Sequence, residues 1–306
     1  MNINSTDFVI NQLINSPTTF NYGVKTIWFD QPYNLYLEEI QSKAYLEMIS
    51  GEKFASLVHE PAKQLIEEFK GSILKDIKEP IEFYDLGPGL PTKTIPLLKA
   101  LQKLKRDFKY IPVDISKSFL KITENKVKKI GVQAHSLNCF FEDLPAKIKY
   151  DQKVNRIFFI GLTFDNYRPD KILSLLKKVS NPNSISIIIT EFFSSKKKET
   201  ILIPYRDKHA ENFNYLVLKI AGIDKNKLKY FTQYKNQRIE MGFTLRRDIR
   251  VRNLTIKRNT KIITAISYRY TKQALIRTIS DYFKHFEIYQ SPKHDISLVT
   301  FKLFEK

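Results

Sequence analysis

The chain has 306 residues, of which 51 are lysine or arginine and 32 are aspartate or glutamate, so its formal net charge is +19 at pH 7. Its hydrophobic content of 42% is ordinary for a globular protein, and no run is long and apolar enough to span a bilayer. A single cysteine, Cys139, excludes an internal disulfide and a cysteine-based zinc site, and the five histidines form no H-x-x-x-H pair, so we predict no metal site.

The excess of positive charge has two interpretations. A basic protein can use its charge to bind nucleic acid. The lysines are spread along the whole chain, however, mostly on the expected outer faces of helices and in loops. We therefore favour solvated surfaces and keep RNA as an alternative substrate. The first 19 residues lack the apolar core of a secretory signal, which together with the lone cysteine predicts a cytoplasmic location.

Residues 1 to about 25 show weak periodicity, and helical patterns follow at residues 35–40 and 54–69. From residue 83 onward, apolar runs alternate with patterns of helical spacing. The runs predict strands at 83–86, 109–113, 155–161 and 184–193, with a weaker one at 132–136, and the spacing predicts helices at 92–104, 116–129 and 169–179. Continuous apolar strands that alternate with helices predict a parallel sheet covered on both faces.

The alternation stops at a basic loop, residues 194–198. The next patterns predict a helix at 209–221, then antiparallel strands at 228–234, 237–247, 249–258 and 260–270. The chain ends with a predicted helix at 271–283 and two strands, 286–289 and 296–303, joined by a turn that contains Pro292. We predict a Rossmann-like α/β core from residues 61–193 and 271–306. Residues 1–60 and the insertion 194–270 are expected to form an α+β cap over its ligand site.

A glycine turn, residues 87–89, lies between the first core strand and the first core helix. Glycine lets a ligand approach the backbone closely, and the helix behind the turn offers free N–H groups. A phosphate loop would need a glycine directly before Lys93, and the dinucleotide pattern G-x-G-x-x-G fails at Thr92. The pattern that remains, Asp85 followed by two glycines, is the first loop of S-adenosylmethionine (SAM) methyltransferases, so we predict SAM as the cofactor.

A second acid, Asp114, ends the next predicted strand. A carboxylate at the carboxyl tip of that strand can accept hydrogen bonds from both ribose hydroxyls of a nucleotide. The alternative is that Asp114 only caps the following helix. Because Asp114 accompanies the glycine turn, we favour the ribose role.

Four segments resemble one family, the histidine-specific N-alpha-methyltransferases of ergothioneine biosynthesis, whose relatives include tryptophan-derivative N-methyltransferases of fungi. Residues 86–94 match the family pattern L-G-x-G-x-x-x-K-T, and residues 112–116 are similar to its second-strand motif. Residues 159–167 keep the glycine, threonine and asparagine of F-L-G-S-T-I-G-N-L, and residues 238–241 match R-I-E-M. The resemblance runs from about Trp28 to the end of the chain.

The resemblance implies a class I SAM methyltransferase fold with a terminal antiparallel hairpin, and an enzyme that needs no metal. It implies that SAM is bound by Asp85, Gly87, Gly89, Lys93, Asp114, Ser116, Cys139, Phe140 and Gly161. It also implies that Asn166 and Tyr205 act on an amino-acid-like substrate, which Tyr45, Met241 and Ser267 contact as well.

Two departures from the family pattern affect these expectations. Cys139, or with a shift Glu142 or Asp143, stands where the family has an acid beside the adenine. The family's E-V-S segment resembles residues 265–267, and here the acid that would hold an imidazole is Ala265. We therefore predict a small amine or amino-acid-like substrate other than histidine.

Two rival functions remain at this stage. The first is methylation of RNA or protein, docked on a basic strip formed by Arg246, Arg247, Arg250 and Arg252. The second is a non-catalytic SAM-binding protein. We expect no membrane partner, and the sequence leaves the oligomeric state open.

Overall fold

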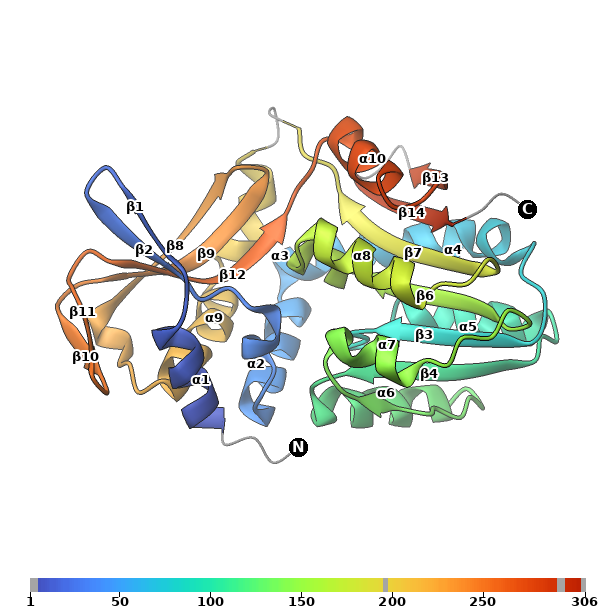
Figure 1. Ribbon diagram of the computed structural model, residues 1–306, viewed down its shortest axis with the longest axis horizontal. Coiled ribbons are helices and arrows are strands. Elements are labelled where there is room, and N and C mark those ends of the chain that lie inside the picture. Colours follow the sequence, from blue (N-terminus) through green and yellow to red (C-terminus); the bar gives the residue numbers. More distant parts are fainter. Residues whose placement is uncertain (1–4, 195–197, 291–294, 304–306) are drawn as a thin grey trace. The chain divides into compact units, whose positions relative to one another are not determined.

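The structure is a computed structural model that describes residues 5–194, 198–290 and 295–303. The chain forms two compact units, each with its own sheet (Figure 1). Unit 1 comprises Met1–Ala55 and Ser195–Tyr268, and unit 2 comprises Ser56–Ser194 and Arg269–Lys306. The middle of the predicted basic loop and the turn at Pro292 lie outside the described residues.

Unit 2 contains a seven-stranded sheet with the order β13-β14-β7-β6-β3-β4-β5. Its strands are β3 (Ile81–Leu86), β4 (Phe108–Asp114), β5 (Leu137–Asn138), β6 (Asn155–Gly161), β7 (Ser184–Glu191), β13 (His285–Gln290) and β14 (Ile296–Lys302). Strands β3 to β7 run parallel, whereas β14 pairs antiparallel with both β7 and β13. The predicted parallel sheet with a terminal antiparallel hairpin is confirmed.

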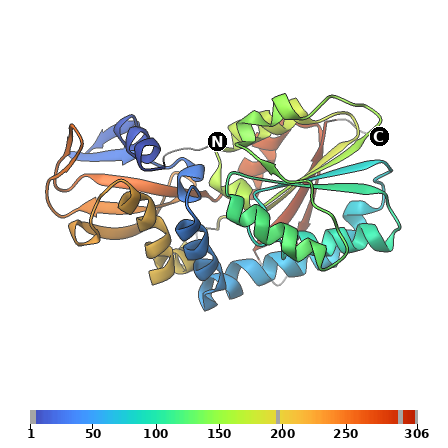
Figure 2. The same cartoon turned by 90° about the horizontal axis from the view of Figure 1, so that it is seen from below.

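Helices cover both faces of this sheet, as Figures 1 and 2 show. One face carries α4 (Glu60–Leu74), α5 (Thr94–Lys103) and α6 (Lys117–Lys128), and the other carries α7 (Leu144–Lys147), α8 (Pro169–Val179) and α10 (Lys272–Ser280). Helix α8 shows why these helices pack against the sheet. Its buried residues Ile172, Leu173, Leu176 and Val179 recur at helical spacing and form one apolar stripe in the core.

The third strand of the sheet lies later in the chain than predicted. Residues 132–136 make only an isolated bridge, between Ala134 and Tyr110. Strand β5 instead pairs with the very end of β4, where Leu137 lies opposite Val113. The Asn138 amide holds this short strand in place, because it donates to the carbonyl oxygens of the two residues at the tip of β4, at 3.0 and 2.7 Å.

Unit 1 contains a five-stranded sheet with the order β1-β2-β12-β9-β8. Its strands are β1 (Thr18–Asn21), β2 (Val24–Trp28), β8 (Leu228–Lys235), β9 (Arg238–Leu245) and β12 (Lys261–Tyr268). Its main helices are α1 (Ser5–Ile14), α2 (Glu39–Ser50) and α9 (Lys208–Ile220), with a short α3 (Glu52–Phe54). Helix α9 packs on β9 and β12 and against α1 and α2.

Two predictions for unit 1 are wrong, the strand at 249–258 and the helix at 35–40, since the helix in that region, α2, begins only at Glu39. Residues 249–258 do not form one strand but a hairpin of β10 (Ile249–Val251) and β11 (Leu254–Ile256), which turns at Arg252 with a φ of +52°. The weakly periodic N-terminal segment forms α1 and the β1–β2 hairpin, and β2 pairs parallel with β12. In the described part of the chain, no helix is long and apolar enough to cross a membrane.

Candidate cofactor and substrate sites

The glycine turn is fixed to two neighbouring strands. Gly87 and Gly89 have φ values of +71° and +51°, in the left-handed region that favours glycine. The Gly87 N–H donates to the Val113 carbonyl at 2.8 Å, and the Thr163 hydroxyl donates to the Gly87 carbonyl at 3.2 Å. A Cβ at Gly87 would lie 3.0 Å from the Thr163 side chain and 3.5 Å from the Phe141 ring. Position 87 therefore favours glycine both for its positive φ and for its close packing against Thr163.

Asp85 lies behind the turn and is 1% exposed. Its carboxylate accepts hydrogen bonds from the hydroxyls of Thr94 at 2.6 Å and Tyr110 at 2.8 Å, which connects β3 to the first turn of α5 and to β4. Burial raises the pKa of Asp85 to about 6, against the opposing effects of these hydrogen bonds and of the Lys93 charge. Sequence reasoning missed Thr94 and Tyr110, because nothing in their local pattern shows that they meet the same carboxylate.

Lys93 is buried at the start of α5. Burial lowers the pKa of its ammonium to about 8, and the nearby Asp85 carboxylate opposes this shift. The end of β6 is close, since a Cβ at Gly161 would lie 3.9 Å from the Lys93 Cε. His59, which sequence reasoning also missed, lies near Lys93 in a π-helical turn, Ala55–His59. Burial and then the Lys93 charge lower the pKa of His59 to about 3, so this imidazole is neutral at pH 7.

Asp114 ends β4 beside the turn and is 7% exposed. One of its carboxylate oxygens accepts the Ser116 N–H at 2.8 Å. The cap of α6 is Ser116, whose hydroxyl accepts the Phe119 N–H at 3.3 Å, so Asp114 is not the helix cap. Burial raises the pKa of Asp114 to about 7; the Asp85 charge adds to the shift, and hydrogen bonds from backbone N–H groups oppose it.

The segment expected beside the adenine follows β5. Cys139 is 8% exposed within the apolar core, and burial raises the pKa of its thiol. Phe140 is half-buried, Glu142 is exposed and Asp143 is half-buried. The next ring, Phe141, packs against Tyr167 with a centroid distance of 5.3 Å and lies close to the turn. Phe141 therefore lies beside the glycine turn, a position that the sequence did not predict.

Asn166 ends the loop that follows β6, the 3-10 helix η4 (Leu162–Asn166), and is half-buried. The residue before it is fixed in the core. Asp165, 2% exposed, accepts from the Thr190 hydroxyl at 2.7 Å and from the Arg269 guanidinium at 2.8 Å. Arg269 also lies 3.1 Å from the Glu191 carboxylate. This buried cluster holds the loop that carries Asn166 at the carboxyl ends of β6 and β7.

The predicted cofactor residues therefore meet at the carboxyl ends of parallel strands, where α/β sheets bind ligands. The chemistry of the groups present fits SAM. Asp114 is a carboxylate that can accept ribose hydroxyls, Lys93 is a buried ammonium that can pair with a carboxylate, and the two glycines of the turn leave room for close approach. No group of three or more potential metal ligands lies together among the described residues.

Of the five predicted substrate residues, Asn166 lies in unit 2, and the other four lie in unit 1. The Tyr205 hydroxyl is 3.5 Å from the Ser267 hydroxyl. Met241 lies opposite Ala265 across β9 and β12, two positions from Ser267 along β12, so these three side chains share one face. Tyr45 reaches α9, since its ring centroid lies 5.6 Å from that of Phe213.

The opposite face of the same sheet holds the charged residues of the R-I-E-M segment. Glu240 is 2% exposed and accepts hydrogen bonds from Arg238 at 2.9 Å and Gln233 at 2.7 Å. The Arg238 guanidinium stacks 4.5 Å from the Trp28 ring. Of that segment, Ile239 and Met241 share a face with Ala265, because Ile239 pairs with Ser267 and Met241 with Ala265.

Comparisons with known proteins identify the family of this chain. The family model described as "Histidine-specific methyltransferase, SAM-dependent" matches residues 55–303, so the chain belongs to this family. An O-methyltransferase family protein from Burkholderia thailandensis has the same fold, with a TM-score of 0.50, 8% identity and coverage of 97% of this chain and 68% of that one. A SAM-dependent methyltransferase from Clostridium acetobutylicum is similar at a TM-score of 0.48 and 13% identity over 85% and 98% of the two chains.

The comparison with curated proteins finds no match. The family and the fold together establish a SAM-dependent methyltransferase of the class I, Rossmann-like type, with SAM as its cofactor. The predicted family, fold class, enzyme class and cofactor are confirmed.

Proposed function

We propose that this enzyme methylates the nitrogen of a small amino-acid-like amine other than histidine. The observation that carries this proposal is Ala265. It shares a face with Met241 and Ser267, yet its methyl group offers no acceptor for an imidazole N–H. Glu240, the nearest acid on β9, points to the other face and is occupied by Arg238. A buried N–H without a partner is strongly disfavoured, so histidine should be a poor substrate.

For the cofactor, we propose that the ionised Asp114 accepts both ribose hydroxyls and that Lys93 pairs with the methionine carboxylate. Gly87 and Gly89 allow close approach, while Asp85 acts indirectly by orienting Lys93 and Thr94. These groups are adjoined by the remaining predicted cofactor contacts, which are Ser116, Cys139, Phe140 and Gly161. Bound SAM supplies a methyl group that is already activated by the positive sulfonium.

For the substrate, we propose that the Asn166 amide binds the amino and carboxylate groups. The Tyr205 hydroxyl orients the amine, and Tyr45, Met241 and Ser267 contact the rest of the molecule. Alignment of a nitrogen lone pair with the methyl group contributes up to about 7–11 kcal/mol in well-oriented cases. A phenol and an amide are weak bases at pH 7, so the amine gives up its proton to solvent.

The test is a competition assay with isotopically labelled SAM. Amino acids and small amines, including histidine, are supplied at equal concentrations, and labelled products are identified by mass spectrometry. We expect label in an amine other than histidine. Asn166→Ala should reduce the label, whereas Asn125→Ala, an exposed position on α6, should not. Preferential labelling of histidine would contradict the proposal.

The rival RNA or protein substrate has less support, because the basic strip is partly engaged within unit 1. Arg252 forms an ion pair with Asp7 and a hydrogen bond with Asn11, and Arg247 donates to Asn226 at 3.2 Å. Adding cellular RNA to the same assay distinguishes the two functions, since label in RNA would favour the rival.

A further inference from the structure

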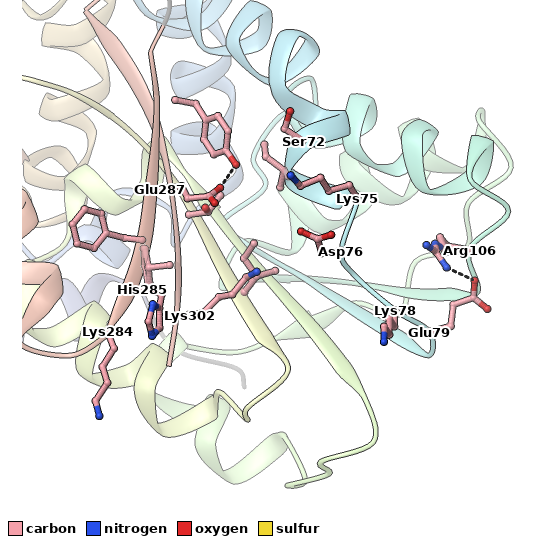
Figure 3. A pocket seen from close by; sticks show the side chains of 16 residues that line it. Ser72, Lys75, Asp76, Lys78, Glu79, Arg106, Lys284, His285, Glu287 and Lys302 are labelled. Atoms are coloured by element: carbon pink, nitrogen blue, oxygen red, sulfur yellow. Dashed lines mark hydrogen bonds and ion pairs between the residues drawn. The ribbon is translucent and has the colours of Figure 1, made fainter. Parts of the chain in front are cut away.

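Unit 2 contains a second cavity, of about 1110 Å³, at the opposite end of the sheet from the glycine turn. It is lined by the end of α4 and the segment after it, by Arg106 before β4, and by the β13–β14 hairpin (Figure 3). Two further lining residues lie at the amino ends of parallel strands. Ile185 is the second residue of β7, and Glu79 lies two residues before β3. Strand β3 alone spans roughly 17 Å, so this cavity is separate from the cofactor site.

The alternation of side chains along the hairpin creates the cavity wall. Glu287 and Tyr289 on β13 line the cavity, as do Thr300 and Lys302 on β14. The neighbouring Ile288 packs against the apolar core on the other face of the sheet. The polar and charged side chains of the hairpin therefore lie on the face of the sheet that carries α4. They line the cavity together with residues that follow the end of α4 at Leu74.

The cavity carries more positive than negative charge. Its cations are Lys75, Lys78, Arg106, Lys284 and Lys302, and its acids are Asp76, Glu79 and Glu287.

Two of the three acids contact other groups of the cavity. Glu79 lies 3.7 Å from the Arg106 guanidinium, and Glu287 accepts the Tyr289 hydroxyl. Burial, then Glu287 and more weakly Asp76, raises the pKa of Tyr289.

The cations have few partners. None of the four lysines forms an ion pair with another residue in the described ranges, and Figure 3 draws none. The Nε atom of Arg106 is buried and has no hydrogen-bond partner among the described residues. The Arg106 side chain as a whole is 32% exposed, so its outer N–H groups, rather than Nε, are the ones that a ligand in the cavity can reach.

We propose that this cavity binds a phosphate-bearing small molecule of the size of a nucleotide. Its volume lies just above the range of about 300–1,000 Å³ that is usual for small-molecule sites, so a nucleotide-sized ligand fits. Lysine binds phosphate as a point charge, and arginine can bind it through two parallel hydrogen bonds. The cations stand on separate elements around one concave space. That arrangement fits a compact polyanion better than a nucleic-acid strand, which needs a groove that follows its backbone.

The test is calorimetric titration of the whole protein at 0.15 M salt with inorganic tripolyphosphate, ATP and adenosine. We expect tripolyphosphate and ATP to bind and adenosine not to bind. Lys75→Gln/Lys284→Gln should weaken binding about tenfold or more, because each lost lysine removes a charge-assisted hydrogen bond. Both lysines are exposed, so the variant should fold, and Lys302→Gln is a second variant of the same site.

The matched control is Lys177→Gln/Lys178→Gln, two exposed lysines at the end of α8 on the other face of the sheet. It removes the same two positive charges as the test variant and should leave the affinities for tripolyphosphate and ATP unchanged. Equal weakening in both double variants would assign the binding to overall charge and overturn the proposal. So would an absence of binding at millimolar ligand, or binding of oligouridylate RNA alone. The SAM affinity of each variant, measured separately, should not change.

Discussion

If Asp114 and Lys93 bind SAM as proposed, the affinity for SAM should depend on pH in both directions, because both buried groups must then be charged. Burial raises the pKa of Asp114 to about 7, and burial lowers the pKa of Lys93 to about 8. In the free enzyme, the ribose-binding carboxylate is ionised mainly above pH 7, and the ammonium is charged mainly below pH 8. Affinity should therefore be highest between these values.

The size of the effect follows from the fraction of enzyme in which both groups are charged, because the apparent Kd rises as that fraction falls. With the pKa values of about 7 and 8, that fraction is about 0.6 at pH 7.5 and about 0.09 at pH 6 or pH 9. The Kd for SAM should therefore be about sixfold weaker at pH 6 and at pH 9 than at pH 7.5.

Calorimetric titration in buffers of different ionisation enthalpy measures both the Kd and the protons exchanged. Binding at pH 6 should release about 0.9 proton from Asp114, and binding at pH 9 should take up about 0.9 proton at Lys93. The sign follows from the free enzyme: its carboxyl group is mostly protonated at pH 6, and its amine is mostly neutral at pH 9.

Two variants separate the two limbs of the profile. Asp114→Asn should bind SAM more weakly and lose the acid limb. Lys93→Arg, whose guanidinium stays charged throughout, should lose the basic limb. A basic limb that persists in Lys93→Arg would place the titration in SAM itself and refute the assignment of Lys93. A Kd that does not change between pH 6 and pH 9 would refute the reasoning for both residues.

Three further predictions concern stability and turnover. Gly242→Ala should cost roughly 3 kcal/mol or more of unfolding free energy, because the new Cβ would lie 2.1 Å from the Ile262 carbonyl oxygen across β9 and β12. Gly71→Ala, with nothing within 4 Å on α4, should instead stabilise by about 0.5–1 kcal/mol; denaturant unfolding of both variants is the check. Arg269→Met should cost about 3–5 kcal/mol by leaving its buried carboxylate partners unpaired, and a variant as stable as the parent would contradict this. Asn166→Ala should lower kcat roughly 10²-fold with the SAM Kd unchanged, measured by initial rates and titration; a change confined to SAM binding would assign Asn166 to the cofactor instead.

The core of unit 2 was readable from the sequence because its signals are local. The buried strand β6 and the amphipathic helix α8 occur at the residues where their apolar patterns predicted them. The glycine turn and Asp114 also follow from local patterns, because a parallel strand carries its ligand-binding residues at its carboxyl end. These features sufficed to predict the fold and the cofactor, whereas the family followed from the resemblance of four segments to its motifs.

Other parts of the structure depend on residues that are far apart in the chain. Strand β2 pairs with β12 more than 230 residues later, so weak local periodicity could not reveal it. The alternating pattern of residues 249–258 fits a strand, but a left-handed turn at Arg252 divides it into a hairpin.

The sequence by itself determined the class of chemistry, since an acid, a glycine turn and a second acid occupy fixed positions at the ends of successive strands. Only the tertiary structure decided the charge states on which that chemistry depends. Asp85, Asp114 and Lys93 have shifted pKa values because the fold removes them from water and places them close together. Packing alone also gathers the four lysines around the second cavity, which come from two distant parts of the sequence.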